Sequence, residues 1–171
     1  MTERFFFALW PDEEQRSALA KFQRALPGHQ GRLVHPDEYH ITLVFLGDIE
    51  ARSRACAEEV ANLVRTSSFQ LTLDRFGCFP RAGILWCGAS GRPRPLLDLL
   101  DALKRGLTDC GFRPERRRFA PHVTLARKAR RLQARELVDP IAWPVSEFSL
   151  VLARSGERPR YRVVRSWPLV S

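Results

Sequence analysis

Two short motifs in this sequence place a histidine and a threonine two positions apart. The motifs are His40-Ile41-Thr42-Leu43 and His122-Val123-Thr124-Leu125. The chain has only four histidines, so composition alone rarely produces the same motif twice. In a β-strand, residues i and i+2 point to one face, while the residues between them point to the other. The motifs therefore predict two strands that each present an imidazole and a hydroxyl on one side.

These four polar side chains match the needs of phosphodiester hydrolysis. Water must lose a proton as it attacks phosphorus, and the departing alkoxide must gain one. Imidazole has an unperturbed pKa of about 6.5, so near neutral pH one ring can be a neutral base while the other is a cationic acid. The threonine hydroxyls would hydrogen-bond the non-bridging phosphoryl oxygens, where negative charge must be stabilised. The near symmetry of the motifs leaves open which histidine is the acid.

Two other interpretations of the motifs are weaker. A single His-x-Thr is most often a half-buried strand residue beside a β-former, but the recurrence argues against that explanation. A metal site is disfavoured because the carboxylates Asp37, Glu38 and Asp48 flank only the first motif, whereas arginines surround the second. Zinc needs three or four ligands, and the motifs supply two. We therefore predict acid–base catalysis without a metal ion.

The segments that must position the first motif alternate between strand and helix patterns. A strand-like aromatic run covers 4–10, an amphipathic helix follows over 11–26, and a strand over 40–46 carries the motif. A second helix-like stretch covers 51–65. Alternating apolar residues then predict a strand over 69–75.

The second half of the chain repeats this order. A strand over 84–86 precedes a leucine-striped helix from Leu96 to Leu107, which stops near Gly111. The second motif is followed by a helix-like stretch over 129–137 and by alternating strands over 148–154 and 161–167. The repetition predicts two related lobes with one histidine each. The fold class is therefore α+β, with mostly antiparallel sheet and helices on the outer faces.

Composition predicts a soluble globular protein with an anionic partner. Hydrophobic residues make up 44% of the 171 residues, and no apolar run reaches the roughly 20 residues that a membrane-spanning helix requires. The net charge is +9, and 25 of the 28 basic residues are arginine, whose planar fork matches phosphate oxygens.

The four cysteines are Cys56, Cys78, Cys87 and Cys110. They form no CxxC pair and no spacing typical of metal ligands. We therefore expect four reduced thiols, packed as small apolar residues, in a cytoplasmic protein.

Further segments match one known family along nearly the whole chain. They are the aromatic first strand over 4–9, Val34 and Pro36 ahead of the first motif, Phe45-Leu46-Gly47 after it, Phe79-Pro80-Arg81 leading to Leu85-Trp86, the run from Arg118 to Arg127, and the terminal strand over 161–169. With these segments the sequence resembles the two-histidine (2H) phosphoesterases. Within them it is most similar to the bacterial and archaeal RNA 2',3'-cyclic phosphodiesterases, also called LigT-like or 2'-5' RNA ligase-like proteins.

The resemblance implies a single bilobal domain over residues 1–171 with a central cleft and no metal or nucleotide cofactor. It implies hydrolysis of a 2',3'-cyclic phosphate, on an RNA end or a nucleoside, to a 2'-phosphate. By position, His40 is similar to the family's proton donor and His122 to its proton acceptor. Thr42, Thr124 and Arg127 would bind the substrate. We expect a monomer with no membrane association.

Two positions depart from the family pattern, with Leu33 where many members have tryptophan and His35 where proline is common. These departures would affect base recognition more than the chemistry. We expect His29 and His35 to lie on the surface in loops. Basic residues gather around the second motif and would attract RNA phosphates: Arg113, Arg116, Arg117, Arg118, Arg127, Lys128, Arg130 and Arg131.

Three alternatives to this function remain open. The chain could act on another cyclic phosphate or perform 2'-5' RNA ligation. It could also be a basic RNA-binding protein without catalytic activity.

Overall fold

One antiparallel sheet organises residues 1–26, 31–130 and 133–171, which this computed structural model describes. Within these ranges nine strands pair in the order β7-β4-β5-β6-β3-β1-β8-β9, with the short β2 beside β6. The strands are β1 (Glu3–Leu9), β2 (Arg32–Leu33), β3 (Ile41–Ile49), β4 (Phe69–Phe79), β5 (Ile84–Gly88), β6 (His122–Arg127), β7 (Arg135–Val145), β8 (Glu147–Ala153) and β9 (Tyr161–Pro168).

Helices α1 (Glu13–Ala25), α2 (Ala51–Leu63) and α3 (Arg94–Asp109) cover one face of the sheet, and a short 3-10 helix, η1 (Pro36–Glu38), precedes β3. The side chain of Asp12 caps α1 by accepting hydrogen bonds from the backbone N–H groups of Glu14 and Gln15. All five leucines of the predicted stripe are buried in α3. These helices confirm the predictions over 11–26, 51–65 and 96–107, and together with the sheet they confirm the α+β class.

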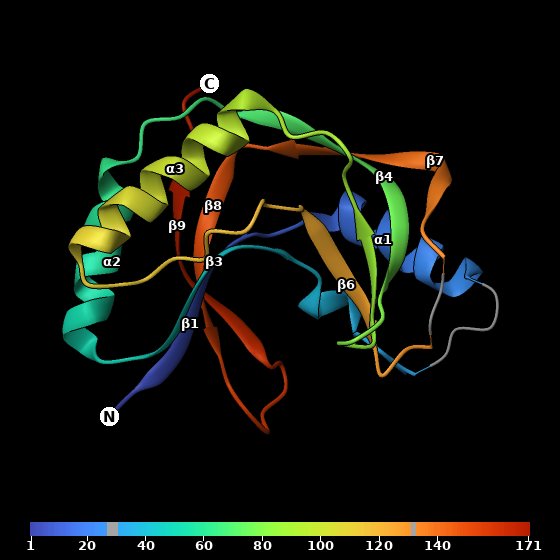
Figure 1. The fold of residues 1–171 in the computed structure, drawn as a ribbon, viewed down its shortest axis with the longest axis horizontal. Helices are drawn as coiled ribbons and strands as arrows, with labels where there is room; N and C mark the ends of the chain where they lie inside the picture. Colours follow the sequence, from blue (N-terminus) through green and yellow to red (C-terminus); the bar gives the residue numbers. More distant parts are fainter. Residues whose placement is uncertain (27–30, 131–132) are drawn as a thin grey trace.

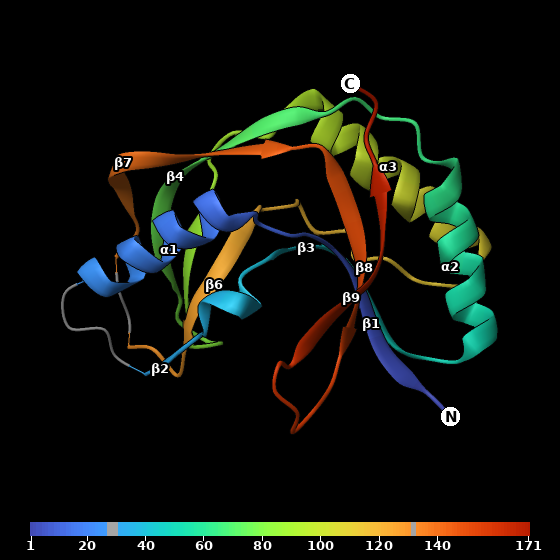
Figure 2. The ribbon, with the colours of Figure 1, turned by 180° about the vertical axis from the view of Figure 1, so that it is seen from behind.

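A single residue pair joins the two motif strands. Ile41 on β3 pairs with Val123 on β6, and no other pair connects these strands in the described part of the chain. On either side of the junction lie the His40 lobe, made of β3, β1, β8 and β9, and the His122 lobe, made of β6, β5, β4, β7 and β2. Figure 1 and the reverse view in Figure 2 show α2 and α3 together beside the first lobe and α1 beside the second.

The lobes are not the two halves of the sequence. Strand β4, from the first half, pairs with β5 and β7 in the His122 lobe, whereas β8, from the second half, pairs with β1 in the His40 lobe. Helix α1 contacts β7, and α3 contacts both α2 and β3. Each lobe therefore takes elements from both halves of the chain.

The predicted helix over 129–137 is wrong. Residues 129 and 130 are not helical, residues 131 and 132 lie outside the described ranges, and Arg135–Leu137 open the strand β7. Pro140 and Pro144 lie within β7 and cannot donate backbone hydrogen bonds, which disfavours a helix but is tolerated in an edge strand. Leu137, Ile141, Trp143 and Val145 are buried, so alternation at period two decides the structure of this segment.

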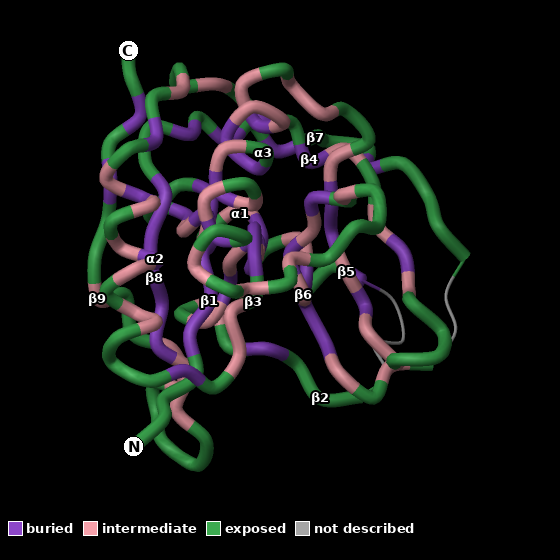
Figure 3. Tube along the Cα trace, turned by 60° about the vertical axis from the view of Figure 1, so that its left-hand side comes forward, coloured by how far each residue is buried: buried purple, intermediate pink, exposed green. Residues whose placement is uncertain are grey.

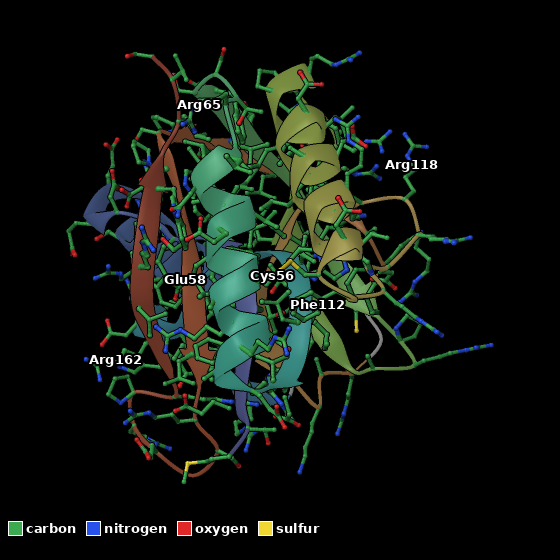
Figure 4. All side chains as sticks on the ribbon, turned by 90° about the vertical axis from the view of Figure 1, so that its left-hand side faces the viewer. Cys56, Glu58, Arg65, Phe112, Arg118 and Arg162 are labelled. Carbon is green, nitrogen blue, oxygen red and sulfur yellow. A yellow bond between two sulfur atoms is a disulfide. The ribbon has the colours of Figure 1, made fainter. Side chains whose placement is uncertain are left out.

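The prediction of four reduced thiols is also wrong. Cys56 on α2 forms a disulfide with Cys110, the residue that caps the end of α3, across a sequence separation of 54 residues (Figure 4). Cys78 and Cys87 are free. Local spacing could not reveal this bond because it depends on how two helices pack.

None of the helices in the described ranges is long and apolar enough to cross a membrane, and the cytoplasmic location stays a prediction.

We predict that the unreduced protein, once unfolded, contains two titratable thiols rather than four. Replacing Cys56 and Cys110 with alanine should lower the free energy of unfolding by about 2–4 kcal/mol, because the disulfide restricts the unfolded chain. Urea unfolding would measure this free energy in the double variant, with Cys78→Ala, which removes a free cysteine, as the control. A titration that finds four thiols would contradict the disulfide.

Candidate active site

The junction between β3 and β6 places the four polar residues of the two motifs on one face. Ile41 and Val123 are fully buried and point into the core. Extending their antiparallel register by one residue sets His40 opposite Thr124 and Thr42 opposite His122. The motifs therefore form a four-cornered group of two imidazoles and two hydroxyls, all half-buried.

Each imidazole is oriented by a carbonyl two residues earlier in the chain. Nδ1 of His40 donates to the carbonyl oxygen of Glu38, and Nδ1 of His122 donates to that of Ala120, both at 2.7 Å. A carbonyl oxygen only accepts, so Nδ1 carries the proton in each neutral ring. Nε2 is left unprotonated and points away from the backbone. Both rings are thus prepared to exchange a proton at Nε2.

Aromatic side chains enclose His40. Its ring stacks on Trp10 with centroids 5.5 Å apart and contacts Phe6 and the edge of Tyr161, each at 4.9 Å. Burial is the largest cause that lowers the pKa of His40 to about 4, although its hydrogen bond to the carbonyl of Glu38 raises it. The positive charges of Arg127, His122 and Arg160 lower it further, so these groups lie near His40. The unliganded His40 is therefore neutral at neutral pH.

His122 has a more open environment. Among the described residues, the aromatic side chain that it contacts is Phe79, which lies edge-on to it with ring centroids 5.2 Å apart. Phe79 in turn stacks against Trp86. The two histidines thus have similar backbone positions but differ in burial.

The site occupies the face of the sheet opposite the helices. There, Phe6, Ala8 and Val151 form a second, small core that Trp10 and Tyr161 pack against. Strand β1 is consequently buried on both faces, which explains its uninterrupted apolar sequence. Figure 3 shows its buried course through the middle of the sheet. The central strand therefore supports the main core on one side and His40 on the other.

A β-bulge brings Arg127 to the same face as His122 and Thr124. Trp86 on β5 lies opposite Thr124, but the preceding residue, Leu85, lies opposite Ala126, so Leu125 is an extra residue in β6. Without the bulge, Arg127 would point into the core, because residues an odd number of positions apart in a regular strand face opposite sides and Arg127 is five residues from His122. With it, the half-buried guanidinium joins the polar group.

Gln23 on α1 holds this bulge. Its buried amide donates from Nε2 to the carbonyl oxygen of Leu125 at 2.8 Å and to that of Val34 at 2.9 Å. The backbone N–H of Val34 also donates to the Leu125 oxygen. The clamp therefore ties α1, the segment ahead of the first motif and the bulge together. Sequence reasoning missed Gln23, although it lies four residues after Leu19 on the apolar side of α1, where a polar residue needs a partner.

The structure also places the two departures from the family pattern. Leu33 pairs with Ala126 through β2 and is 41% exposed. His35 is exposed, as predicted, and its Nδ1 accepts a hydrogen bond from the backbone N–H of Asp37 as the cap of η1. The prediction for His29 lies outside the described residues.

The predicted basic stretch lies on the surface before and after β6. Arg113, Arg116, Arg117 and Arg118 are exposed in the segment that leads to His122, and Figure 4 shows Arg118 projecting into solvent. Arg117 is paired with Glu115. Arg131 lies outside the described ranges.

The donor set around the histidines does not suit a metal ion. Within the described ranges, no three His, Cys, Asp or Glu side chains cluster closely enough to hold one. Two imidazoles, two hydroxyls and an arginine on a shared sheet face are instead the groups that acid–base chemistry on a phosphoryl group requires. The fold and the site thus have the features of a two-histidine phosphoesterase.

Comparison with known proteins agrees with this class. The sequence profile of the 2'-5' RNA ligase superfamily matches residues 10–157. The RNA 2',3'-cyclic phosphodiesterase of Escherichia coli (strain K12) is 31% identical over 98% of this chain and 97% of its own length. That of Aeropyrum pernix is 35% identical over 72% and 76%, respectively. The crystal structure of E. coli LigT complexed with 3'-AMP superposes with a TM-score of 0.88 at 29% identity over 100% of both chains. The chain belongs to the 2'-5' RNA ligase superfamily.

We predict that Gln23→Leu weakens the binding of inorganic phosphate by about tenfold, because a misplaced Arg127 loses a charge-assisted hydrogen bond that contributes about 1.5 kcal/mol or more. Calorimetric titration would measure this affinity in Gln23→Leu, Arg127→Ala and the double variant. If Gln23 acts through Arg127, the double variant binds no more weakly than Arg127→Ala. Gln15→Leu, another buried glutamine on α1, is the control and should lower stability only. Additive losses in the double variant would contradict this role.

The lowered pKa of His40 predicts a loss of stability in acid. Because the folded state binds this proton only near pH 4 while the unfolded chain binds it near pH 6.5, the unfolded state holds more protons between these values. The free energy of unfolding should therefore fall as the pH drops from about 6.5 to 4, by up to about 1.4 kcal/mol per pH unit from this residue. Urea unfolding of the wild type and His40→Asn, with His35→Asn as the exposed control, would measure it. Equal acid sensitivity in the wild type and His40→Asn would contradict the prediction.

Proposed function

We propose that this chain is an RNA 2',3'-cyclic phosphodiesterase that hydrolyses a terminal 2',3'-cyclic phosphate to a 2'-phosphate without a metal ion or nucleotide cofactor. The observation that carries the proposal is the pair of imidazoles with Nδ1 bound to backbone carbonyls, which leaves two Nε2 atoms for one phosphoryl group. The names of the relatives from E. coli and A. pernix support the same activity. RNA ends are the proposed substrates, and a monomer is the proposed active form.

In the proposed reaction, His122 is the proton acceptor and His40 the proton donor. Nε2 of His122 removes a proton from water as the water oxygen forms a bond to phosphorus. The bond from phosphorus to the ribose 3' oxygen breaks, and Nε2 of His40 donates a proton to that oxygen. The hydroxyls of Thr42 and Thr124 donate hydrogen bonds to the non-bridging oxygens, and Arg127 neutralises part of their charge. The product carries a 2'-phosphate and a free 3' hydroxyl.

The donor role requires the substrate to change the protonation of His40. In the unliganded site burial and the nearby positive charges of Arg127 and Arg160 keep the ring neutral. A phosphodiester anion between these cations offsets their repulsion and favours the protonated ring. Binding of the substrate thus charges the acid where it is needed.

We predict that His40→Ala and His122→Ala each lower kcat for adenosine 2',3'-cyclic phosphate by about 10²- to 10⁴-fold, because each removes a positioned proton-transfer group. The wild type should keep its activity in the presence of a chelator and show a bell-shaped pH dependence. Phosphate release is not expected, so chromatography should find the 2'-phosphate isomer as the product.

The exposed His35→Ala is the matched control and should retain wild-type kcat. Circular dichroism would show that each variant is folded. A double variant that keeps the activity, or activity abolished by the chelator, would contradict the proposed chemistry. RNA binding without any turnover in the wild type would favour the non-catalytic alternative.

A further inference from the structure

Arg160 is a cation near the site that no motif identified. It lies in the connection between β8 and β9, and its guanidinium covers the ring of Tyr161 with Cζ 5.4 Å from the centroid. The edge of the same Tyr161 ring contacts His40. Arg160 has no carboxylate within 4 Å among the residues that the structure describes, and its charge acts on His40. The aromatic ring thus holds an uncompensated arginine one side chain away from the catalytic group.

A polar cavity of about 620 Å³ begins beside this arginine. It is lined by Thr2, Glu3, Arg4, Asp48, Leu152, Ala153, Arg154, Ser155, Glu157 and Arg160. Ala153 lies opposite both Tyr161 on β9 and Arg4 on β1. Because Arg4, Phe6 and Ala8 alternate along β1, the cavity lies on the same face as Phe6, which contacts His40. Arg4 is about 7 Å further along the strand than Phe6.

The ion pairs in the cavity leave Arg160 as its uncompensated cation. Arg4 is paired with Asp48 at 2.9 Å, and Arg154 with Glu157 at 2.8 Å. Glu3 also lines the cavity but has no arginine within 4 Å among the described residues. Among the arginines of the lining, Arg160 is therefore the one that remains free to bind an anion, and the ring of Tyr161 links it to His40.

We propose that Arg160 and this cavity form a subsite for the phosphodiester group that joins the terminal nucleotide to the nucleotide before it. The inference rests on the proposed function. In an RNA that ends in a 2',3'-cyclic phosphate, the next phosphodiester is attached to the 5' oxygen of the terminal ribose. A guanidinium binds such an anion through two parallel N–H groups. A nucleoside 2',3'-cyclic phosphate lacks this group, so the subsite distinguishes RNA ends from mononucleotides.

The test compares two substrates that share the reacting group. Adenosine 2',3'-cyclic phosphate has no upstream phosphodiester, whereas the dinucleotide ApA with a terminal 2',3'-cyclic phosphate has one. In the wild type, kcat/KM should be higher for the dinucleotide. Arg160→Ala should lower the ratio of the two kcat/KM values by about tenfold or more, mainly through KM, because one charge-assisted contact is lost. Arg160→Lys should restore part of the ratio.

Using a ratio separates this role from an effect on His40. Removing the charge of Arg160 changes the pKa of His40 and hence the pH dependence for both substrates, but that change cancels in the ratio. Arg162 provides the matched control, because it is exposed on β9 and adjoins Tyr161 on the side away from Arg160 (Figure 4). Arg162→Ala should leave the ratio at its wild-type value.

An equal loss for both substrates would overturn the subsite, since it would place Arg160 at the scissile phosphate or at His40. An unchanged ratio would overturn it as well. Calorimetric binding of adenosine 2'-phosphate and of ApA 2'-phosphate tests the subsite without turnover. The wild type could hydrolyse neither substrate and still bind ApA 2'-phosphate more tightly than adenosine 2'-phosphate. If Arg160→Ala then removes that difference in affinity, the subsite holds and the proposed function fails.

Discussion

The contact between Ile41 and Val123 is the constraint on which the site depends. Two strands from separate lobes touch at one residue pair and diverge on both sides. The side chains of this pair point into the core on one face of the sheet. The flanking side chains therefore face the opposite side, His40 and Thr42 on one strand and His122 and Thr124 on the other. The same apolar contact therefore stabilises the junction and brings the two imidazoles to one face of the sheet. A shift of one residue in either strand would turn a histidine into the core.

The near symmetry of the motifs is broken by what surrounds them. Backbone carbonyls orient both imidazoles in the same way. Trp10, Phe6 and Tyr161 enclose His40, whereas His122 meets Phe79 at the rim. Near-identical motifs thus hold two differently enclosed imidazoles, and burial is the main cause that lowers the pKa of His40.

Sequence reasoning identified the parts of this molecule that local pattern determines. The strand alternation of the motifs and the leucine stripe of α3 are visible within a few residues. Features that depend on packing between distant segments were not visible. The disulfide between Cys56 and Cys110, the clamp from Gln23 to the bulge at Leu125 and the contact of Tyr161 with His40 each join segments more than 50 residues apart. In β7, Pro140 and Pro144 were a local indication against a helix, but the helix-like pattern of the segment was given more weight.

The interlacing of the lobes has a consequence for how the molecule is made. Two aromatic side chains that contact His40 come from opposite ends of the chain: Phe6 belongs to β1 and Tyr161 to β9. Helix α1 likewise packs on the distant strand β7. A nascent chain that has emerged through β6 already carries both histidines, yet it lacks β7, β8 and β9. Pairings between such remote segments form slowly because the loop between them must be closed first. Both lobes are therefore completed only late in synthesis, when the C-terminal strands become available to them.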